Sequence, residues 1–217
     1  MTISVFLADD HAVMRDGLRA MLETQHDIRV VGEATNGRDA ARGVSQLRPD
    51  VVVMDIGMPE LNGIEATQQI CERCPSARVI ILSMHSTNEY IRRALAAGAR
   101  GYLLKESAGT EVVQAVRTVH GGSRYLSARV SEQILDEYSQ PREAASAADP
   151  LALLSPRERE VLQLVVEGKT SAEIAQLIFL SPKTVETYRS RLMTKLGVAD
   201  LPGLVKFALQ HGVTQLE

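Results

Sequence analysis

Five polar side chains follow apolar runs in the first half of the chain, and their types suit chemistry on phosphate. Three are carboxylates, one is a hydroxyl and one is an amine. Neighbouring carboxylates repel one another and call for a cation, and oxygen ligands without thiols favour Mg²⁺. An aspartate in such a site can act as a nucleophile and become an aspartyl phosphate, with a lysine neutralising the phosphate oxygens. The residues are Asp9, Asp10, Asp55, Ser83 and Lys105.

The runs before these residues predict buried strands. Asp55 ends the apolar run Val51-Val52-Val53-Met54, and Gly57 and Pro59 then break the chain. Taken alone, Asp55 is equally typical of a helix N-cap. Five such residues at four predicted strand ends are much harder to assign to chance.

Strand-like and helix-like patterns alternate five times, which predicts a doubly wound α/β domain with a five-stranded parallel sheet. Its strand ends would gather the polar side chains at one carboxyl edge, where open sheets bind ligands. The predicted strands cover residues 3–8, 28–34, 51–55, 78–82 and 101–104, and the predicted helices 12–23, 37–47, 63–72, 88–97 and 110–120.

The strand-end motifs resemble the receiver domain of two-component response regulators. The resemblance is carried by Asp9-Asp10, Val53–Pro59, Asn62-Gly63, Ser83 and Gly101–Lys105. It implies a flavodoxin-like sheet of order 2-1-3-4-5 and a cognate sensor histidine kinase as partner.

The same resemblance implies a role for each site residue. Asp55 would accept the phosphoryl group, and Lys105 would contact it. Mg²⁺ would be held by Asp9, Asp10, Asp55 and the backbone carbonyl of Gly57. On phosphorylation Ser83 would turn toward the phosphate and Tyr102 would move inward behind it.

Two positions depart from the family's commonest text or vary within it. Glu106 follows the lysine where proline is frequent, so no cis bond is expected there. Gly57 and His85 lie two residues after Asp55 and Ser83, where the family tunes phosphoryl lifetime. Gly57 also argues against a Mg²⁺-dependent phosphohydrolase of the haloacid dehalogenase type, which needs a second aspartate there. The chain is therefore not expected to be a turnover enzyme.

From residue 151 onward the sequence predicts four short helices and no strand. Ser155-Pro156 and Ser181-Pro182 combine an N-cap with proline at the first helical position. A short helix and a longer amphipathic one, joined by a tight turn, form the helix-turn-helix pattern. The predicted helices cover residues 155–167, 171–177, 181–196 and 200–210.

The motifs of these helices are Leu154–Leu162, Gly168–Thr170, Glu173–Ala175 and Ser181–Tyr188. They resemble the LuxR-type DNA-binding domain, so the whole chain resembles a NarL/FixJ-type response regulator. Double-stranded promoter DNA is the implied partner. Val185, Leu192 and Leu196 form the expected core stripe, with Tyr188 at its edge. The predicted DNA contacts are Lys183, Thr184, Glu186, Thr187, Arg189, Ser190, Arg191 and Lys195. Glu186 departs from the family's frequent lysine and would accept from a cytosine amine.

The charge distribution predicts weak DNA binding by one copy. The net charge of the chain is −3, and residues 151–217 carry eight basic and seven acidic side chains. Because phosphate contacts dominate affinity, a dimer on two half-sites is expected. Phosphorylation would free this domain and permit homodimerisation, with residues 200–210 as one contact.

The predicted organisation is a receiver domain at residues 1–122, a partly helical linker at 123–150 and a DNA-binding domain at 151–217. No apolar run approaches the length of a membrane span, and no secretory signal is visible, so the cytoplasm is expected. Cys71 and Cys74 lack further metal ligands at zinc spacing. The alternative output is a phosphorylation-gated protein contact without DNA binding.

Overall fold

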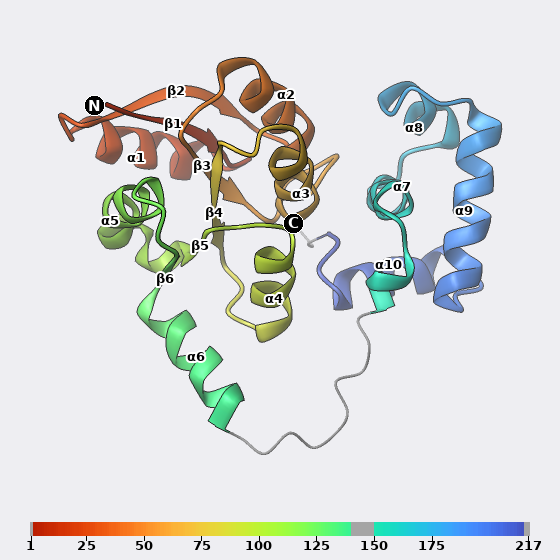
Figure 1. Cartoon of the computed structure of the whole chain (residues 1–217). Coiled ribbons are helices and arrows are strands. Elements are labelled where there is room, and N and C mark those ends of the chain that lie inside the picture. The colour runs from red at the N-terminus through yellow and green to blue at the C-terminus, as the bar shows by residue number, and fades with distance from the viewer. Residues whose placement is uncertain (1, 140–149, 215–217) are drawn as a thin grey trace. The chain divides into compact units, whose positions relative to one another are not determined.

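The chain forms two compact units, residues 1–142 and 143–217, each described by itself (Figure 1). The computed structural model describes residues 2–139 and 150–214. The first unit alternates strands and helices: β1 (Ile3–Ala8), α1 (Ala12–Glu23), β2 (Ile28–Ala34), α2 (Gly37–Leu47), β3 (Val51–Asp55), α3 (Gly63–Arg73), β4 (Arg78–Ser83), α4 (Asn88–Ala96), β5 (Gly101–Leu104), η1 (Lys105–Ser107), α5 (Ala108–His120), β6 (Tyr125–Leu126) and α6 (Ala128–Ser139).

The sheet is parallel and has six strands in the order β2-β1-β3-β4-β5-β6. The predicted order of the first five strands is confirmed, but the predicted count of five was wrong. Strand β6 pairs with β5, with Tyr102 opposite Leu126, and Val130 of α6 is fully buried in the core of the first unit. A two-residue strand is too short to carry a periodic pattern, which is why this stretch resembled linker.

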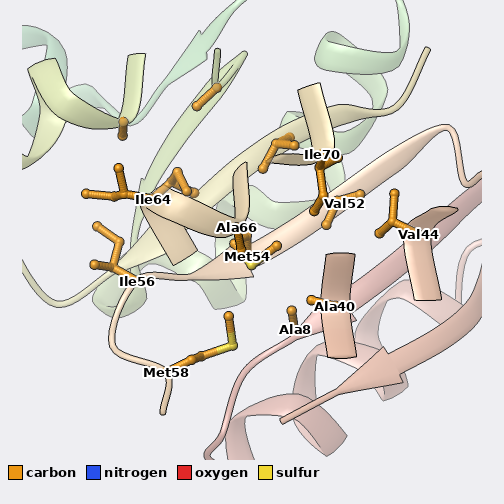
Figure 2. Packing of buried hydrophobic residues seen from close by; sticks show 14 of the residues in the cluster. Ala8, Ala40, Val44, Val52, Met54, Ile56, Met58, Ile64, Ala66 and Ile70 are labelled. Carbon is orange, nitrogen blue, oxygen red and sulfur yellow. The ribbon is translucent and has the colours of Figure 1, made fainter. Parts of the chain in front are cut away.

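Strand β3 is buried on both faces, as its apolar run predicts. Val52 and Met54 pack into one core with residues of α2, α3 and α4, and Figure 2 shows this layer around Met54. Val51 and Val53 pack into a second core on the other face, with residues of α1 and α5. Since side chains alternate along a strand, Asp55 falls on the same face of β3 as Val51 and Val53, at the carboxyl end of the strand.

Helix α3 starts tightly against the end of β3. The Asn62 side chain caps it by accepting from the backbone of Ile64 and Glu65. The Gly63 backbone N–H donates to the carbonyl of Ile56 at 2.9 Å. A Cβ at Gly63 would lie 1.9 Å from the Asp55 carbonyl oxygen, so only glycine allows this approach.

We expect Gly63→Ala to lower the free energy of unfolding by about 3 kcal/mol, because the backbone of the Asp55 loop must move. Urea unfolding measures it. Gly109→Ala is the matched control, because a Cβ at Gly109 in α5 meets nothing within 4 Å. That substitution should stabilise the protein by about 0.5–1 kcal/mol. Equal losses for both variants would contradict the steric argument.

The second unit consists of helices around its own core. Its elements are η2 (Pro150–Leu153), α7 (Pro156–Val166), α8 (Ser171–Leu177), α9 (Pro182–Leu196) and α10 (Leu201–Gln210). Helices α7 and α8 begin with capping boxes, Ser155 with Glu158 and Thr170 with Glu173. Residues 140–149 of the predicted linker lie outside the described residues.

The predicted core stripe of α9 is confirmed. Val185 and Leu192 are fully buried, and Leu196 and Tyr188 pack partly buried against the same cluster. No helix within residues 2–139 and 150–214 is both long and apolar enough to cross a membrane.

Candidate functional site

The ends of β1, β3 and β4 and the start of η1 bring four predicted site residues to one edge of the sheet. The Lys105 ammonium lies 2.8 Å from Asp55 Oδ2 and 3.0 Å from Asp9 Oδ2. All three side chains are at most 6% exposed. Ser83 ends β4 and is also buried. The parallel sheet therefore joins residues that lie far apart in the sequence.

The acidic group has room for a divalent cation. One ligand atom each from Asp9, Asp10, His11 and Asp55 lies within 4.8 Å of the others. Asp9 Oδ2 is buried and accepts no well-directed hydrogen bond, although the Lys105 ammonium is near it. Three carboxylates opposed by one ammonium leave an excess of negative charge. These residues fit Mg²⁺, which prefers oxygen ligands and few protein carboxylates.

The negative charge of Asp55 is unfavourable at this buried position. The pKa of this carboxyl is raised to about 6, chiefly by burial and further by the charge of Asp9, against the opposing effect of Lys105. Burial works against the charge of Lys105, but Asp55 and Asp9 raise its pKa above the usual value. Binding of a second cation, or protonation of Asp55, should therefore stabilise the folded protein.

In EDTA, wild-type protein is expected to lose stability relative to Asp55→Asn as the pH rises from 4 to 7.5. The folded-state pKa of about 6 lies above the ordinary aspartate value of 3.8, so the stabilising contribution is present below about pH 4 and lost as the pH rises through 6. The difference should reach about 3 kcal/mol at pH 7.5. Urea titrations of both proteins at each pH measure it. A difference that does not change with pH would refute the assignment.

Ser83 and Tyr102 are both hydrogen-bonded to the backbone of His85, just after β4. The Ser83 hydroxyl accepts from the backbone N–H of His85 at 2.9 Å. Tyr102 is fully buried, and its hydroxyl donates to the His85 carbonyl at 2.7 Å. Burial raises the pKa of this phenol far above its usual value. The ring that was expected to move inward on switching is already inside in this structure.

Four of the predicted DNA-contact residues gather on one side of α9. A shallow groove of about 340 Å³ is lined by Lys183, Thr184, Thr187 and Arg191, together with Ser181 and Tyr188. Lys183, Thr187, Ser190 and Arg191 are exposed. Their position at the start and middle of the longer helix suits contact with DNA.

Three further predicted contacts, Glu186, Arg189 and Lys195, bond to neighbouring helices, although Glu186 and Lys195 remain exposed. Glu186 accepts from the Ser171 hydroxyl at the start of α8, and Arg189 Nη1 donates to the same hydroxyl at 3.1 Å. The Lys195 ammonium lies 2.7 Å from the carboxylate of Glu158. These contacts join α9 to α8 and α7, which helical spacing alone did not reveal.

The comparisons with known proteins agree with both units. Residues 5–117 match the response regulator receiver domain, and residues 152–208 match the bacterial regulatory proteins of the luxR family. The chain belongs to the NarL/FixJ-type response regulators. It is 39% identical to the oxygen regulatory protein NreC of Staphylococcus epidermidis, over 96% of this chain and 97% of that protein. It is 40% identical to the transcriptional regulatory protein MctR of Rhizobium johnstonii, over 97% and 95%.

Solved structures of response regulators have the same two-part architecture. RcsB of Salmonella typhimurium matches 95% of this chain and 97% of its own, with 29% identity and a TM-score of 0.60. A further RcsB structure, at 27% identity and a TM-score of 0.59 over 95% of this chain and 98% of its own, is a complex with DNA.

This response regulator is a two-component DNA-binding transcriptional regulator and not a turnover enzyme. The predicted family and function are confirmed. The matches favour neither alternative, the phosphohydrolase nor the protein-contact module without DNA. Two residues with contacts at these sites were not singled out from the sequence, His11 and Ser171. The signal for His11 was available, since it directly follows the acidic pair.

Proposed function

We propose that Asp55 accepts a phosphoryl group from a phosphohistidine of a cognate sensor kinase. The observation that carries the proposal is the Lys105 ammonium between the buried carboxylates of Asp55 and Asp9. A carboxylate oxygen of Asp55 forms the new bond to phosphorus. The bond from phosphorus to the kinase nitrogen breaks, and its electron pair stays with the imidazole.

Asp9, Asp10, Asp55 and the backbone carbonyl of Gly57 would hold Mg²⁺. When bound, Mg²⁺ supplies positive charge that offsets the charge of the phosphoryl oxygens. Lys105 already lies beside the Asp55 carboxylate and would pair with another phosphoryl oxygen.

Ser83 and Tyr102 would report the phosphoryl group to the rest of the receiver. The Ser83 hydroxyl accepts from the His85 backbone N–H, and we expect it to turn toward the phosphoryl group and donate to it. The Tyr102 hydroxyl donates a hydrogen bond to the backbone carbonyl of His85. A shift of residues 83–85 would therefore change the hydrogen bond of the Tyr102 hydroxyl.

The proposed output is dimerisation and promoter binding through α9. A second copy would supply the phosphate contacts that a near-neutral domain lacks. In support, one RcsB structure, 28% identical with a TM-score of 0.59, holds two dimers bound to two parallel DNAs. The exposed apolar side of α10, lined by Leu201, Pro202, Val205 and Leu209, is the proposed dimer contact. The cytoplasm, where promoter DNA lies, is the expected location.

The test is phosphorylation by a small phosphodonor with Mg²⁺, followed by native mass and binding to a promoter fragment selected by the wild-type protein. We expect one phosphoryl group per chain, a dimer and tighter DNA binding in the wild type. Asp55→Asn should lose all three responses, whereas Asp16→Asn, at an exposed position of α1, should keep them. Phosphorylation of Asp55→Asn equal to wild type would refute the assignment. Equal DNA binding with and without donor would refute the control.

A further inference from the structure

His11 lies beside the cation site, directly after the acidic pair. It occupies the N-cap position of α1, yet its side chain makes no capping hydrogen bond. Its backbone N–H donates to Asp9 Oδ1 at 2.8 Å. The imidazole Nδ1 lies 2.8 Å from Asp10 Oδ1 and 3.3 Å from Asp9 Oδ1. The ring is thus turned back over the carboxylates, although two thirds of its surface is exposed.

The separation of the ligand atoms suits one metal ion. Divalent ions hold nitrogen and oxygen ligands at about 2.0–2.2 Å, so ligands on opposite sides of the ion lie about 4 Å apart. The nitrogen of His11 and one oxygen each of Asp9, Asp10 and Asp55 all lie within 4.8 Å of one another. The 4.8 Å limit exceeds this spacing by about 0.8 Å, so small shifts among the four side chains would bring their ligand atoms into range. The backbone contact to Asp9 keeps the ring close to the site.

An imidazole changes which ion the site prefers. Mg²⁺ binds oxygen almost exclusively and keeps several waters, so a nearby nitrogen contributes little to its affinity. Mn²⁺, Co²⁺, Ni²⁺ and Zn²⁺ accept imidazole readily, and affinities for a given site rise from Mn²⁺ through Co²⁺ to Ni²⁺. A receiver site with three carboxylates and one imidazole would therefore hold these ions more tightly than carboxylates alone.

We propose that His11 is a nitrogen ligand that gives the acidic site of this receiver a preference for transition-metal ions over Mg²⁺. The inference rests on the cation site of the proposed function and adds one ligand and a selectivity to it. His11 is the only histidine or cysteine in the metal-capable clusters among residues 2–139 and 150–214. The competing interpretation is that His11 only hydrogen-bonds Asp10 and never touches the ion.

The experiment loads the full-length protein with Mn²⁺ alone and measures nitrogen coupling to the ion by pulsed electron paramagnetic resonance. An imidazole nitrogen bound to Mn²⁺ produces a coupling that carboxylates and water do not. We expect this coupling in wild type and its loss in His11→Ala. It should also be lost in His11→Asn, which keeps a hydrogen-bond donor for Asp10 but has no imidazole. His26→Ala, at an exposed position outside the site, should keep it.

Calorimetric titration of the same variants with Mg²⁺ and Co²⁺ provides the second readout. We expect His11→Ala to weaken Co²⁺ binding by about tenfold or more. The affinity for Mg²⁺ should change by less than about twofold, since this ion keeps water where the imidazole would bind. His26→Ala should change neither affinity.

Each of the remaining outcomes would contradict a different part of the proposal. Manganese that binds without nitrogen coupling, or equal losses of Mg²⁺ and Co²⁺ affinity in His11→Ala, would overturn the role of His11 and leave the Mg²⁺ site intact. Failure of Mg²⁺, Mn²⁺ and Co²⁺ alike to bind wild type would overturn the cation site of the proposed function together with this inference. Phosphorylation of Asp55 is measured separately, so neither result is confused with failure of the phosphoacceptor.

Discussion

Lys105→Met should lower the free energy of unfolding by about 3 kcal/mol at pH 7.5 in EDTA, because it removes the cation from two buried carboxylates. Lys105 Nζ contacts Asp55 at 2.8 Å and Asp9 at 3.0 Å. Methionine has nearly the same length and keeps the apolar packing of the lysine stem. The loss should therefore report charge and not volume. Urea unfolding measures it.

Two conditions should rescue this variant. At pH 5 the loss should shrink, because Asp55, whose pKa is already raised to about 6, takes a proton in place of the missing cation. Saturating Mg²⁺ should restore stability by binding the uncompensated carboxylates. Lys206→Met on the exposed surface of α10 is the control and should change stability by less than about 0.5 kcal/mol. An equal loss at pH 5 and pH 7.5 would attribute the effect to packing.

The double variant Lys183→Ala/Arg191→Ala should weaken DNA binding by about tenfold or more per bound copy at low salt. Both side chains are exposed and line the same groove of α9, so both can reach phosphates. Losing two phosphate contacts should reduce the slope of log affinity against log salt concentration by about 2 per copy. Titrations of a random-sequence duplex at several salt concentrations measure the slope.

Two further sets of variants serve as controls for this prediction. Arg29→Ala/Arg124→Ala removes the same charge from exposed positions of the first unit and should leave the slope unchanged. Lys195→Ala should affect DNA binding less and folding more, because the Lys195 ammonium is held by the buried carboxylate of Glu158. If the Lys195 variant lost as much of the salt slope as the groove variants, the division of the α9 face would be wrong.

The sequence was sufficient for the architecture because its signals are local. The run before Asp55 predicts a strand buried on both faces, and Val51 to Met54 do alternate between two cores. Ser155 with Glu158 and Thr170 with Glu173 mark helix starts within four residues, and both capping boxes form. The sixth strand was missed because two residues carry no period, and its pairing with β5 is a tertiary contact.

The chemical identity of the site was also readable from the sequence. Once the alternating pattern predicts a parallel sheet, the positions of Asp9, Asp55, Ser83 and Lys105 after their strands place them on one edge. Chain order and residue type together determine which groups meet there.

Only the tertiary structure decided how these groups act on one another. The contact of Lys105 with two carboxylates and the burial that raises the pKa of Asp55 depend on distances across the sheet. The direction of the His11 ring, toward the neighbouring acids, was also decided by the structure. The structure also distinguished the groove residues of α9 from Glu186, Arg189 and Lys195, whose side chains contact α8 and α7. Helical periodicity assigns a residue to a face. It does not say which neighbouring element packs there, because that neighbour is set by contacts far along the chain.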